Sequence, residues 1–164
     1  MKPALRIVAV GKLREPFWAA AQDEYVKRLR THSTRLEIVE VADEPTPDDA
    51  APAQEGTTRD REAERILSRL LPRDYVIALD GTRGTSFTSP AFAAQLQTLL
   101  ATGTTSGFTF IIGGSLGLSD AVLSRANLLL SFGAFTLPHQ LMRVVLLEQL
   151  FRAAKITAGQ AYHK

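Results

Sequence analysis

Short apolar runs alternate with amphipathic stretches along this chain, and the alternation predicts strands that alternate with helices. Residues 5–10, 75–80 and 108–112 are apolar on both faces, as in strands that are buried on both sides. Two further strands are predicted over 36–41, where glutamates alternate with apolar residues, and over 128–132. Helices are predicted, from their apolar spacing and from the proline or serine near their starts, over residues 16–32, 58–71, 90–100, 119–125 and 140–157.

This order of elements predicts a single-domain α/β fold, a parallel sheet sandwiched between two layers of helices. A length of 164 residues fits one domain. Ligands of such sheets bind beyond the carboxyl ends of the strands, which directs attention to the loops after residues 10, 79, 112 and 131. Residues 42–57 contain three prolines and five acidic residues, and we expect this acidic segment to be a loop.

Composition excludes several classes of protein and of site. The chain has no cysteine, which excludes disulfides, thiolate metal ligands and cysteine nucleophiles. Its three histidines are far apart in the sequence and have no neighbours at ligand spacing, so no metal site is expected. It has neither an apolar run of about 18 residues nor the pattern of a signal peptide, and we expect a cytoplasmic protein.

Charge is distributed unevenly, although its sum is only +2. Residues 1–36 carry a net charge of +5, residues 37–64 carry −8, and residues 65–164 carry +5. Two basic regions on either side of an acidic one can present a positive face to a polyanion such as a nucleic acid. Solvated helix faces explain the same charges equally simply, so charge alone does not decide between the two.

The segment 108–118, FTFIIGGSLGL, joins a predicted strand to a helix through a glycine turn. Glycines at such a place allow a tight turn and the close approach of a ligand to the backbone. The same residues match G-x-S-x-G, the nucleophile elbow of serine hydrolases, with Ser115 as nucleophile and His139 or His163 as base. Only two acidic residues follow Ser115, and both lie in predicted helices, where a third member of a triad is poorly placed.

The final predicted helix is apolar around most of its circumference. Glu148, Arg152 and Lys155 form one narrow polar stripe, and nearly every other position is apolar. This apolar surface is wider than contact with one sheet requires, which favours a second copy of the chain as partner. Arg143 lies nearly opposite the stripe, so that either its side chain snorkels from the helix start or its charge is positioned in an interface or an active site.

Several motifs, in order along nearly the whole chain, resemble those of one enzyme family. Residues 131–156 form the most specific stretch of the resemblance. The motifs are Gly11-Lys12, Glu24-Tyr25, Lys27-Arg28-Leu29, Ala78-Leu79-Asp80, Ile112-Gly113-Gly114, Gly117-Leu118, Thr136-Leu137-Pro138-His139, Arg143-Val144, Leu147-Glu148, Arg152-Ala153, Ile156 and Tyr162-His163. With them the chain resembles the SPOUT-family methyltransferases, of the H type, that modify N3 of a pseudouridine in 23S ribosomal RNA.

The resemblance implies a homodimer with a deep trefoil knot near the C-terminus, and a pocket for S-adenosylmethionine that three loops create. The implied partners are a second copy of the chain and the ribosomal RNA of the large subunit. No metal is implied, because the sulfonium of the cofactor already carries an activated methyl group. The cofactor-binding residues carried over from the resemblance are Leu79, Gly113, Phe132, Gly133, Ala134, Phe135, Thr136 and Leu137.

Methylation of an imide nitrogen needs a base that removes its proton, or a cation that stabilises the resulting anion. The catalytic candidates are His163 for proton transfer, Arg143 for charge stabilisation and Tyr162 for stacking on a base. Arg152 and Lys164 are the candidates for binding RNA phosphates. We expect the C-terminal tail of the other subunit to complete each site.

The chain departs from the family pattern at Leu116, Phe151 and Ala161, where relatives carry an acidic residue, a tyrosine and a proline. These departures concern the contacts of the cofactor and the geometry of the tail. Two alternatives to a methyltransferase stay open at this point: a small serine hydrolase that uses Ser115, and a non-catalytic RNA-binding module.

Overall fold

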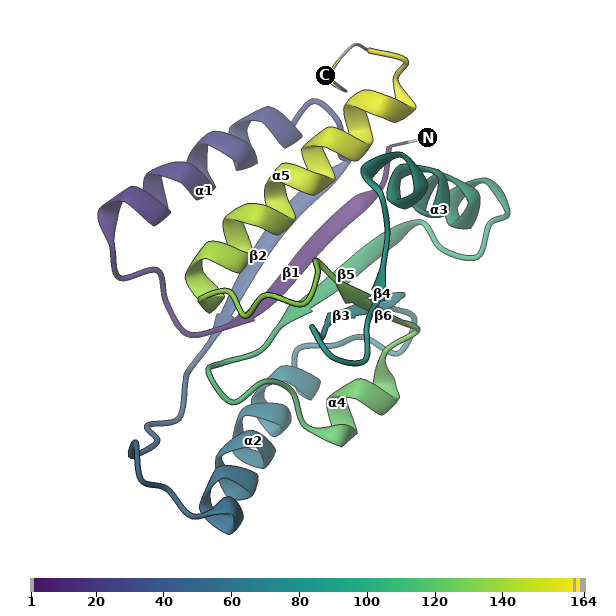
Figure 1. Ribbon diagram of the computed structural model, residues 1–164. Helices are drawn as coiled ribbons and strands as arrows, with labels where there is room; N and C mark the ends of the chain where they lie inside the picture. The colour runs from purple at the N-terminus through teal and green to yellow at the C-terminus, as the bar shows by residue number, and fades with distance from the viewer. Residues whose placement is uncertain (1, 161, 163–164) are drawn as a thin grey trace.

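The computed structural model describes residues 2–160 and residue 162. Its strands are β1 (Ala4–Val10), β2 (Arg35–Val41), β3 (Val76–Leu79), β4 (Thr85–Ser86), β5 (Gly107–Ile112) and β6 (Leu128–Ser131). They form one sheet in the order β2-β1-β5-β3-β6-β4, and every neighbouring pair is parallel (Figure 1). The predicted parallel sheet is therefore confirmed.

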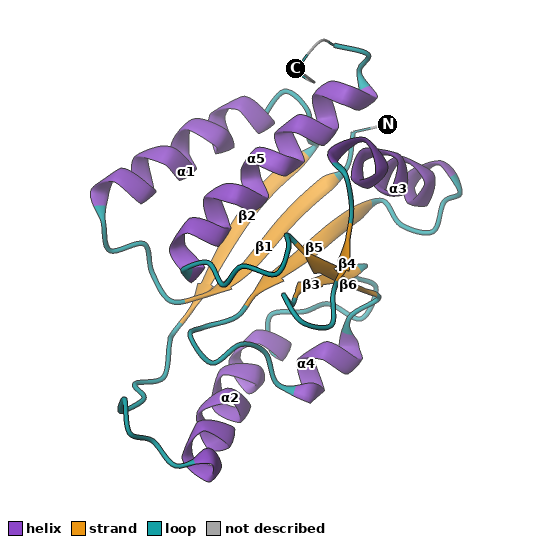
Figure 2. Ribbon diagram, viewed as in Figure 1, coloured by secondary structure: helices purple, strands orange, loops and turns teal. Residues whose placement is uncertain are grey.

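Helices cover both faces of this sheet (Figure 2). They are α1 (Pro16–Leu29), α2 (Pro52–Leu67), α3 (Ser89–Ala101), α4 (Asp120–Arg125) and α5 (His139–Thr157). Helices α1, α3 and α5 lie on one face, with α5 between the other two, and α2 and α4 lie on the opposite face. None of the helices in the described part of the chain combines the length and the apolar character needed to cross a membrane.

Capping residues and prolines set where the helices begin. Helix α3 follows Thr88, whose hydroxyl accepts a hydrogen bond from Ala91 N at 3.3 Å. Helix α4 follows Ser119, whose hydroxyl accepts from Val122 N at 3.4 Å. Proline occupies the first turn of α1, α2 and α3, where the helix has no use for the N–H that proline lacks.

The structure differs from the prediction in the acidic segment and in one edge strand. Helix α2 begins at Pro52, so the expected loop over 42–57 is a loop only as far as residue 51. Proline in the first turn and Glu55 near the positive helix end favour this earlier start. Strand β4 was not predicted, because it consists of two exposed residues without an apolar pattern.

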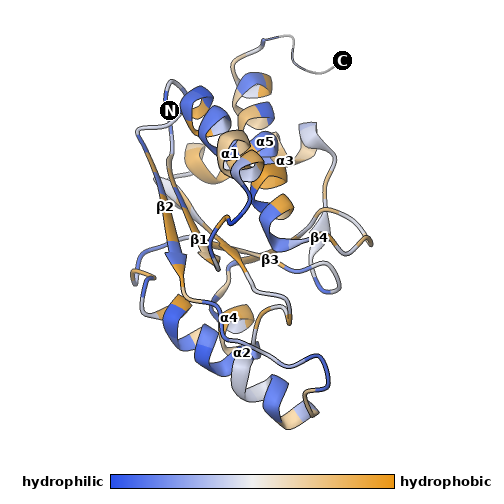
Figure 3. Ribbon diagram, turned by 90° about the vertical axis from the view of Figure 1, so that its left-hand side faces the viewer, coloured by the Kyte–Doolittle hydropathy of each residue, from blue (hydrophilic) through white to orange (hydrophobic). Residues whose placement is uncertain are grey.

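Two apolar layers separate the sheet from its helices. Ile7 and Phe110 belong to the layer beneath α1, α3 and α5, whereas the next residues along their strands, Val8 and Ile111, belong to the layer beneath α2 and α4. Successive side chains of a strand point to opposite faces, which is why these strands are apolar on both faces. Figure 3 shows the contrast between the orange strands and helix α2, which is largely blue along its outer side.

Arg143, near the start of α5, is only 1% exposed. Its Nη1 donates to Glu40 Oε1 at 2.6 Å and to Gln22 Oε1 at 3.3 Å, and its Nη2 donates to the Gly11 carbonyl at 2.9 Å. The guanidinium thus ties α5 to β2, to α1 and to the turn after β1. The snorkelling interpretation is wrong, because the charge is paired inside the molecule.

Strand β6 lies between β3 and β4, although both precede it in the chain. Residues 80–84 connect β3 directly to β4. The chain later returns to the sheet as β6, which lies between these two strands. Few folds insert a strand behind an existing connection in this way. The arrangement favours the trefoil knot that the family resemblance implies, which stays a prediction.

We predict that Glu40→Gln lowers the free energy of unfolding by about 3 kcal/mol, because the buried guanidinium of Arg143 loses its counter-charge. Glu37→Gln is the matched control, since both glutamates belong to β2 and have side chains that are 34% and 35% exposed. Glu37 pairs with Arg35 and Arg6, which retain contact with water, so its replacement is expected to cost less than about 1 kcal/mol. Urea denaturation measures both values, and equal losses would contradict the anchoring role of Arg143.

Candidate functional site

Strands β3, β5 and β6 end at the same edge of the sheet (Figure 1). The segments that follow them line a cavity of about 550 Å³. Pro138, His139 and Met142, at the start of α5, close one side of it. A cavity of this size is in the usual range of small-molecule sites. It is lined by all eight residues that the resemblance carries over: Leu79, Gly113, Phe132, Gly133, Ala134, Phe135, Thr136 and Leu137.

Glycines make the turn after β5 tight. A Cβ added at Gly114 would lie 2.8 Å from Glu62 Oε2, and one added at Gly113 would lie 3.0 Å from the backbone of Gly117. Gly117 has a φ of 77° and donates its N–H to the Gly114 carbonyl at 3.1 Å, which closes the turn. The buried carboxylate of Glu62 also accepts from the backbone N–H of Glu44 at 2.9 Å, so α2 supports the turn from outside the cavity.

The loop between β6 and α5 presents free backbone groups to the cavity. The Ser131 hydroxyl accepts a hydrogen bond from Gly133 N at 3.1 Å, and Gly133 turns the chain with a φ of 116°. Beyond this turn, the backbone N–H groups of residues 134–137 have no hydrogen-bond partner among the described residues. Unpaired backbone groups beside a cavity are available to a ligand with polar edges.

A second polar feature of the cavity is the turn after β3. Asp80 Oδ1 accepts hydrogen bonds from the backbone N–H groups of Thr82 and Arg83 and from the Thr82 hydroxyl, each at 2.8 Å. Although burial opposes its ionisation, these hydrogen bonds hold the pKa of the Asp80 carboxyl below its ordinary value. Asp80 is therefore an ionised residue that shapes the turn.

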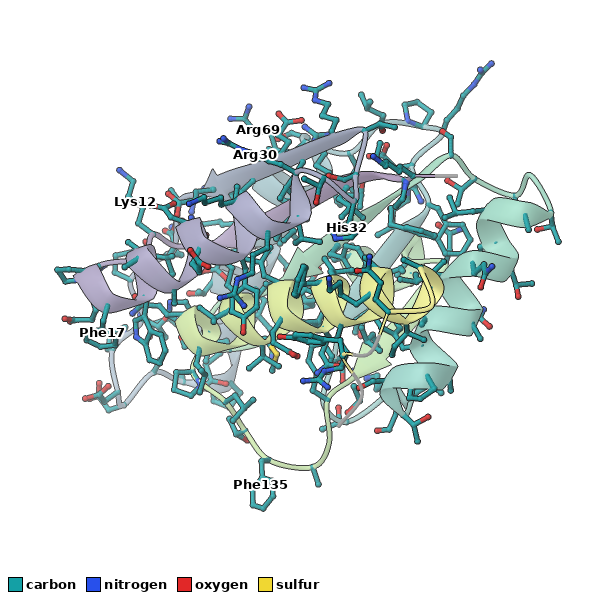
Figure 4. All side chains as sticks on the ribbon, turned by 90° about the horizontal axis from the view of Figure 1, so that it is seen from above. Lys12, Phe17, Arg30, His32, Arg69 and Phe135 are labelled. Carbon is teal, nitrogen blue, oxygen red and sulfur yellow. The ribbon has the colours of Figure 1, made fainter. Side chains whose placement is uncertain are left out.

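Phe135 is the large apolar residue of the cavity that is exposed in the described structure, with 90% of the residue open to solvent. Figure 4 shows the ring projecting outward from the loop that precedes α5. An exposed phenylalanine at the rim of a cavity is unusual in an isolated chain. Its ring is therefore available to a second molecule that covers the rim.

The structure places two other predicted residues at the opposite end of α5. Arg152 donates to Glu148 Oε1 from its Nε at 3.0 Å and from its Nη2 at 2.8 Å, and to the Tyr162 carbonyl from its Nη1 at 3.1 Å. The guanidinium also lies over the Tyr162 ring, 4.9 Å from its centre. Arg152 follows His139 by thirteen positions on the helix, which is about 20 Å along its axis. In a single chain these two residues are therefore remote from the cavity.

Among the remaining candidates, the structure places only Arg143, which does not line the cavity. Arg143 is buried behind the first turns of α5, where Glu40 and the Gly11 carbonyl hold its guanidinium. His163 and Lys164 lie outside the described residues. The catalytic roles of Arg143, Tyr162 and His163 and the RNA-binding roles of Arg152 and Lys164 stay predictions.

A separate cavity of about 390 Å³ lies between α3 and α5, near the amino edge of the sheet. Its walls are mostly apolar and include Leu29, Leu96 and Leu150. None of the predicted site residues within the described part of the chain lines it. The residues that could bind a polar cofactor are thus gathered at the carboxyl edge.

Several residues of the site were not among those predicted for cofactor binding or methyl transfer, although Ser115 and His139 were candidates for the serine hydrolase alternative. The rule that ligands bind beyond the carboxyl ends of strands points to their loops but does not select individual side chains. The position of His139, directly after Pro138 at a predicted helix start, was noticeable in the sequence, but nothing there indicated a role in methyl transfer. The lining residues in this group with most bearing on the chemistry are Asp80, Ile112, Gly114, Ser115, His139 and Met142.

The serine hydrolase alternative is not supported by the arrangement of its residues. Ser115 and His139 line the same cavity, but no hydrogen bond joins them in the described structure. Asp120 is exposed and pairs with Arg83 at 2.8 Å, and Glu148 pairs with Arg152 far along α5. Asp43 acts on His139 through its charge without a hydrogen bond to the imidazole, so no acidic residue of the described chain orients a histidine beside Ser115 as a triad requires.

Comparison with known proteins places the chain in a family. The family described as "Predicted SPOUT methyltransferase" matches residues 3–163. A protein of Clostridium botulinum (strain Langeland) called ribosomal RNA large subunit methyltransferase H is 49% identical over 160 residues, which covers 98% of this chain and 99% of the relative. Relatives of the same name from Streptococcus gordonii and Ligilactobacillus salivarius are 49% and 48% identical, with the same coverage.

Solved structures agree on the fold at much lower sequence identity. The tRNA (m1G37) methyltransferase of Aquifex aeolicus matches with a TM-score of 0.50 and 14% identity, over 91% of this chain and 69% of that one. The Legionella pneumophila protein Lpg2936, solved with its bound cofactor SAM, matches with a TM-score of 0.50 and 13% identity, over 93% of this chain and 66% of that one. The fold, the turns of the cavity and the match over residues 3–163 lead to one conclusion: this chain belongs to the SPOUT methyltransferase family.

Proposed function

We propose that this protein is an S-adenosylmethionine-dependent methyltransferase that methylates N3 of a pseudouridine in the 23S ribosomal RNA of the large subunit. The observation that carries the proposal is that the eight expected cofactor residues, from Leu79 to Leu137, line one cavity. Relatives of nearly equal length are named as methyltransferases of large-subunit ribosomal RNA. Pseudouridine N3 follows from the resemblance of the sequence motifs, and a ribosomal substrate makes the cytoplasm the proposed place of action.

The residues of the cavity fit S-adenosylmethionine. The free backbone groups of residues 134–137 suit the polar edge of adenine and the methionine carboxylate. Leu79, Ile112 and Met142 supply apolar walls, and the glycine turn at Gly113 leaves room for close approach to the backbone. When bound, S-adenosylmethionine supplies a methyl group that is activated by its positive sulfur.

The site requires a second copy of the chain. Arg152 and Tyr162 lie about 20 Å along α5 from the cavity of their own chain, so the tail of a partner must bring the predicted catalytic residues to it. Leu141, Val144 and Val145 on α5 are only partly buried, which leaves an apolar face for that partner. A homodimer with exchanged tails satisfies both observations.

Each predicted catalytic residue has a role in this dimer. Tyr162 stacks on the target base, and His163 takes part in proton transfer. Arg152 and Lys164 bind phosphates of the RNA. Arg143 stabilises negative charge from behind the wall of the cavity, where its guanidinium is already paired within its own chain.

The proposed site makes a prediction about cofactor binding. We expect Gly114→Val to weaken the binding of S-adenosylmethionine by about tenfold or more, because its side chain meets the Glu62 carboxylate and moves the turn. Gly56→Val is the control, since a Cβ at this helical glycine meets nothing within 4 Å. Isothermal titration calorimetry measures both, and equal affinities would remove this turn from the cofactor site.

The proposed function also predicts the product of the reaction. Incubation with tritiated S-adenosylmethionine and with ribosomes, free large subunits or naked ribosomal RNA is expected to label 23S RNA, and mass spectrometry of the nucleosides to identify N3-methylpseudouridine. Cofactor binding without transfer to any of the three substrates would favour the non-catalytic RNA-binding module. Labelling of Ser115 by a fluorophosphonate would favour the hydrolase.

Mixed dimers test whether two chains share one active site. A chain that lacks residues 162–164 and a chain with Gly114→Val are each expected to be inactive, since one lacks the tail and the other a sound cavity. Unfolded and refolded together, they form a mixed dimer that joins the intact cavity of one chain to the intact tail of the other, and activity returns. If activity stays absent although native mass spectrometry detects the mixed dimer, the site is contained in a single chain.

A further inference from the structure

His139 is the first residue of α5 and lines the cofactor cavity. Its imidazole packs against the turn after β1, since a Cβ added at Gly11 would lie 3.4 Å from His139 Nε2. In the described structure, no hydrogen bond to another side chain or to the backbone restrains this imidazole. A histidine that lines a cavity and has no hydrogen-bond partner is available to exchange a proton with a ligand there.

The other titratable side chain among the described residues that line this cavity is Asp80. Asp80 cannot serve easily as a base, because its Oδ1 already accepts three hydrogen bonds and its ionised form is stabilised. His139 is therefore the one side chain lining this described cavity that is both titratable and without a hydrogen-bond partner.

We propose that His139 is a catalytic residue of the methyl transfer, the general base that accepts the N3 proton of the target base. The inference rests on the proposed function, because it needs an acceptor nitrogen that carries an acidic proton. It assigns to the wall of the cavity a task that the sequence motifs suggested for His163 in the tail.

The step balances in atoms and electrons. The N3–H bond of the base breaks and its proton goes to the unprotonated imidazole nitrogen of His139, while the N3 electron pair forms the bond to the methyl carbon. The bond between that carbon and the cofactor sulfur breaks, and its electron pair stays on sulfur. The products are the methylated base, a neutral thioether and an imidazolium, which then releases its proton to water.

The surroundings of His139 favour its unprotonated form, which is the form that a base needs. Burial lowers the pKa of the His139 imidazole below its ordinary value, and the positive charge of Arg143, one turn further along α5, lowers it again. Arg14, in the loop after β1, acts in the same direction, whereas the carboxylate of Asp43, after β2, raises the pKa. The positive end of α5 also disfavours an imidazolium at its first residue.

The test combines kinetics with a direct titration. His139→Gln is expected to lower kcat by about 100-fold or more, to abolish the rise of kcat/KM with pH on the acidic side, and to leave the affinity for S-adenosylhomocysteine unchanged. NMR titration of the imidazole signals, in a chain with only three histidines, follows His139 itself without turnover. His139→Gln identifies its signal, and retained cofactor affinity shows that this variant is folded.

Two charge variants make the test specific. Arg14→Gln removes a positive charge and is expected to move both the His139 titration and the acidic limb of the rate profile to higher pH. Asp43→Asn is expected to move both to lower pH. A purely structural histidine would leave the rate profile in place in both variants.

The inference is overturned if His139→Gln keeps kcat within about threefold of the unaltered chain, or if the acidic limb persists in it. It is equally overturned if His163→Gln, and not His139→Gln, removes that limb. The failure of the proposed function looks different, because then the unaltered chain itself transfers no methyl group to ribosomal RNA.

Discussion

The buried guanidinium of Arg143 connects the parts of the molecule on which the site depends. It binds the Gly11 carbonyl just after β1 and the Glu40 carboxylate near the end of β2, and it does so from the helix whose first turn closes the cavity. A charge that is 1% exposed is stable only when it is paired, so this contact fixes the start of α5 relative to the sheet. His139 lies one turn earlier on the same helix, and its place in the cavity wall follows from that anchor.

The opposite ends of α5 serve different purposes. At its start, His139 and Met142 belong to a cavity bounded by turns, and at its end Arg152 holds the returning tail through the Tyr162 carbonyl. A helix of 19 residues separates the two ends by more than any side chain can reach. Under the proposed function, a site that needs both ends of α5 is most simply built from two chains, each of which contributes its tail to the other.

The sheet and the cavity could be predicted because their signals are local. Strands that are apolar on both faces predict a parallel sheet, and the carboxyl ends of such strands predict which loops lie beside a ligand. The individual residues, Gly113 and the segment 132–137, came from the family resemblance. The start of α2 at Pro52 could not be read from apolar spacing, since its first turn is exposed and polar. The partners of Arg143 could not be predicted either, because Gln22, Glu40 and Gly11 are distant in sequence and only the folded sheet brings them together.

In the proposed cofactor site, the turns after β3, β5 and β6 hold S-adenosylmethionine. A crystal structure of the chain grown with S-adenosylhomocysteine tests it most directly. We predict that the ligand lies at the carboxyl edge, with its adenine against residues 132–137 and its thioether within reach of His139. Ligand density between α3 and α5, beside Leu96 and Leu150, with none at the carboxyl edge, would contradict the claim.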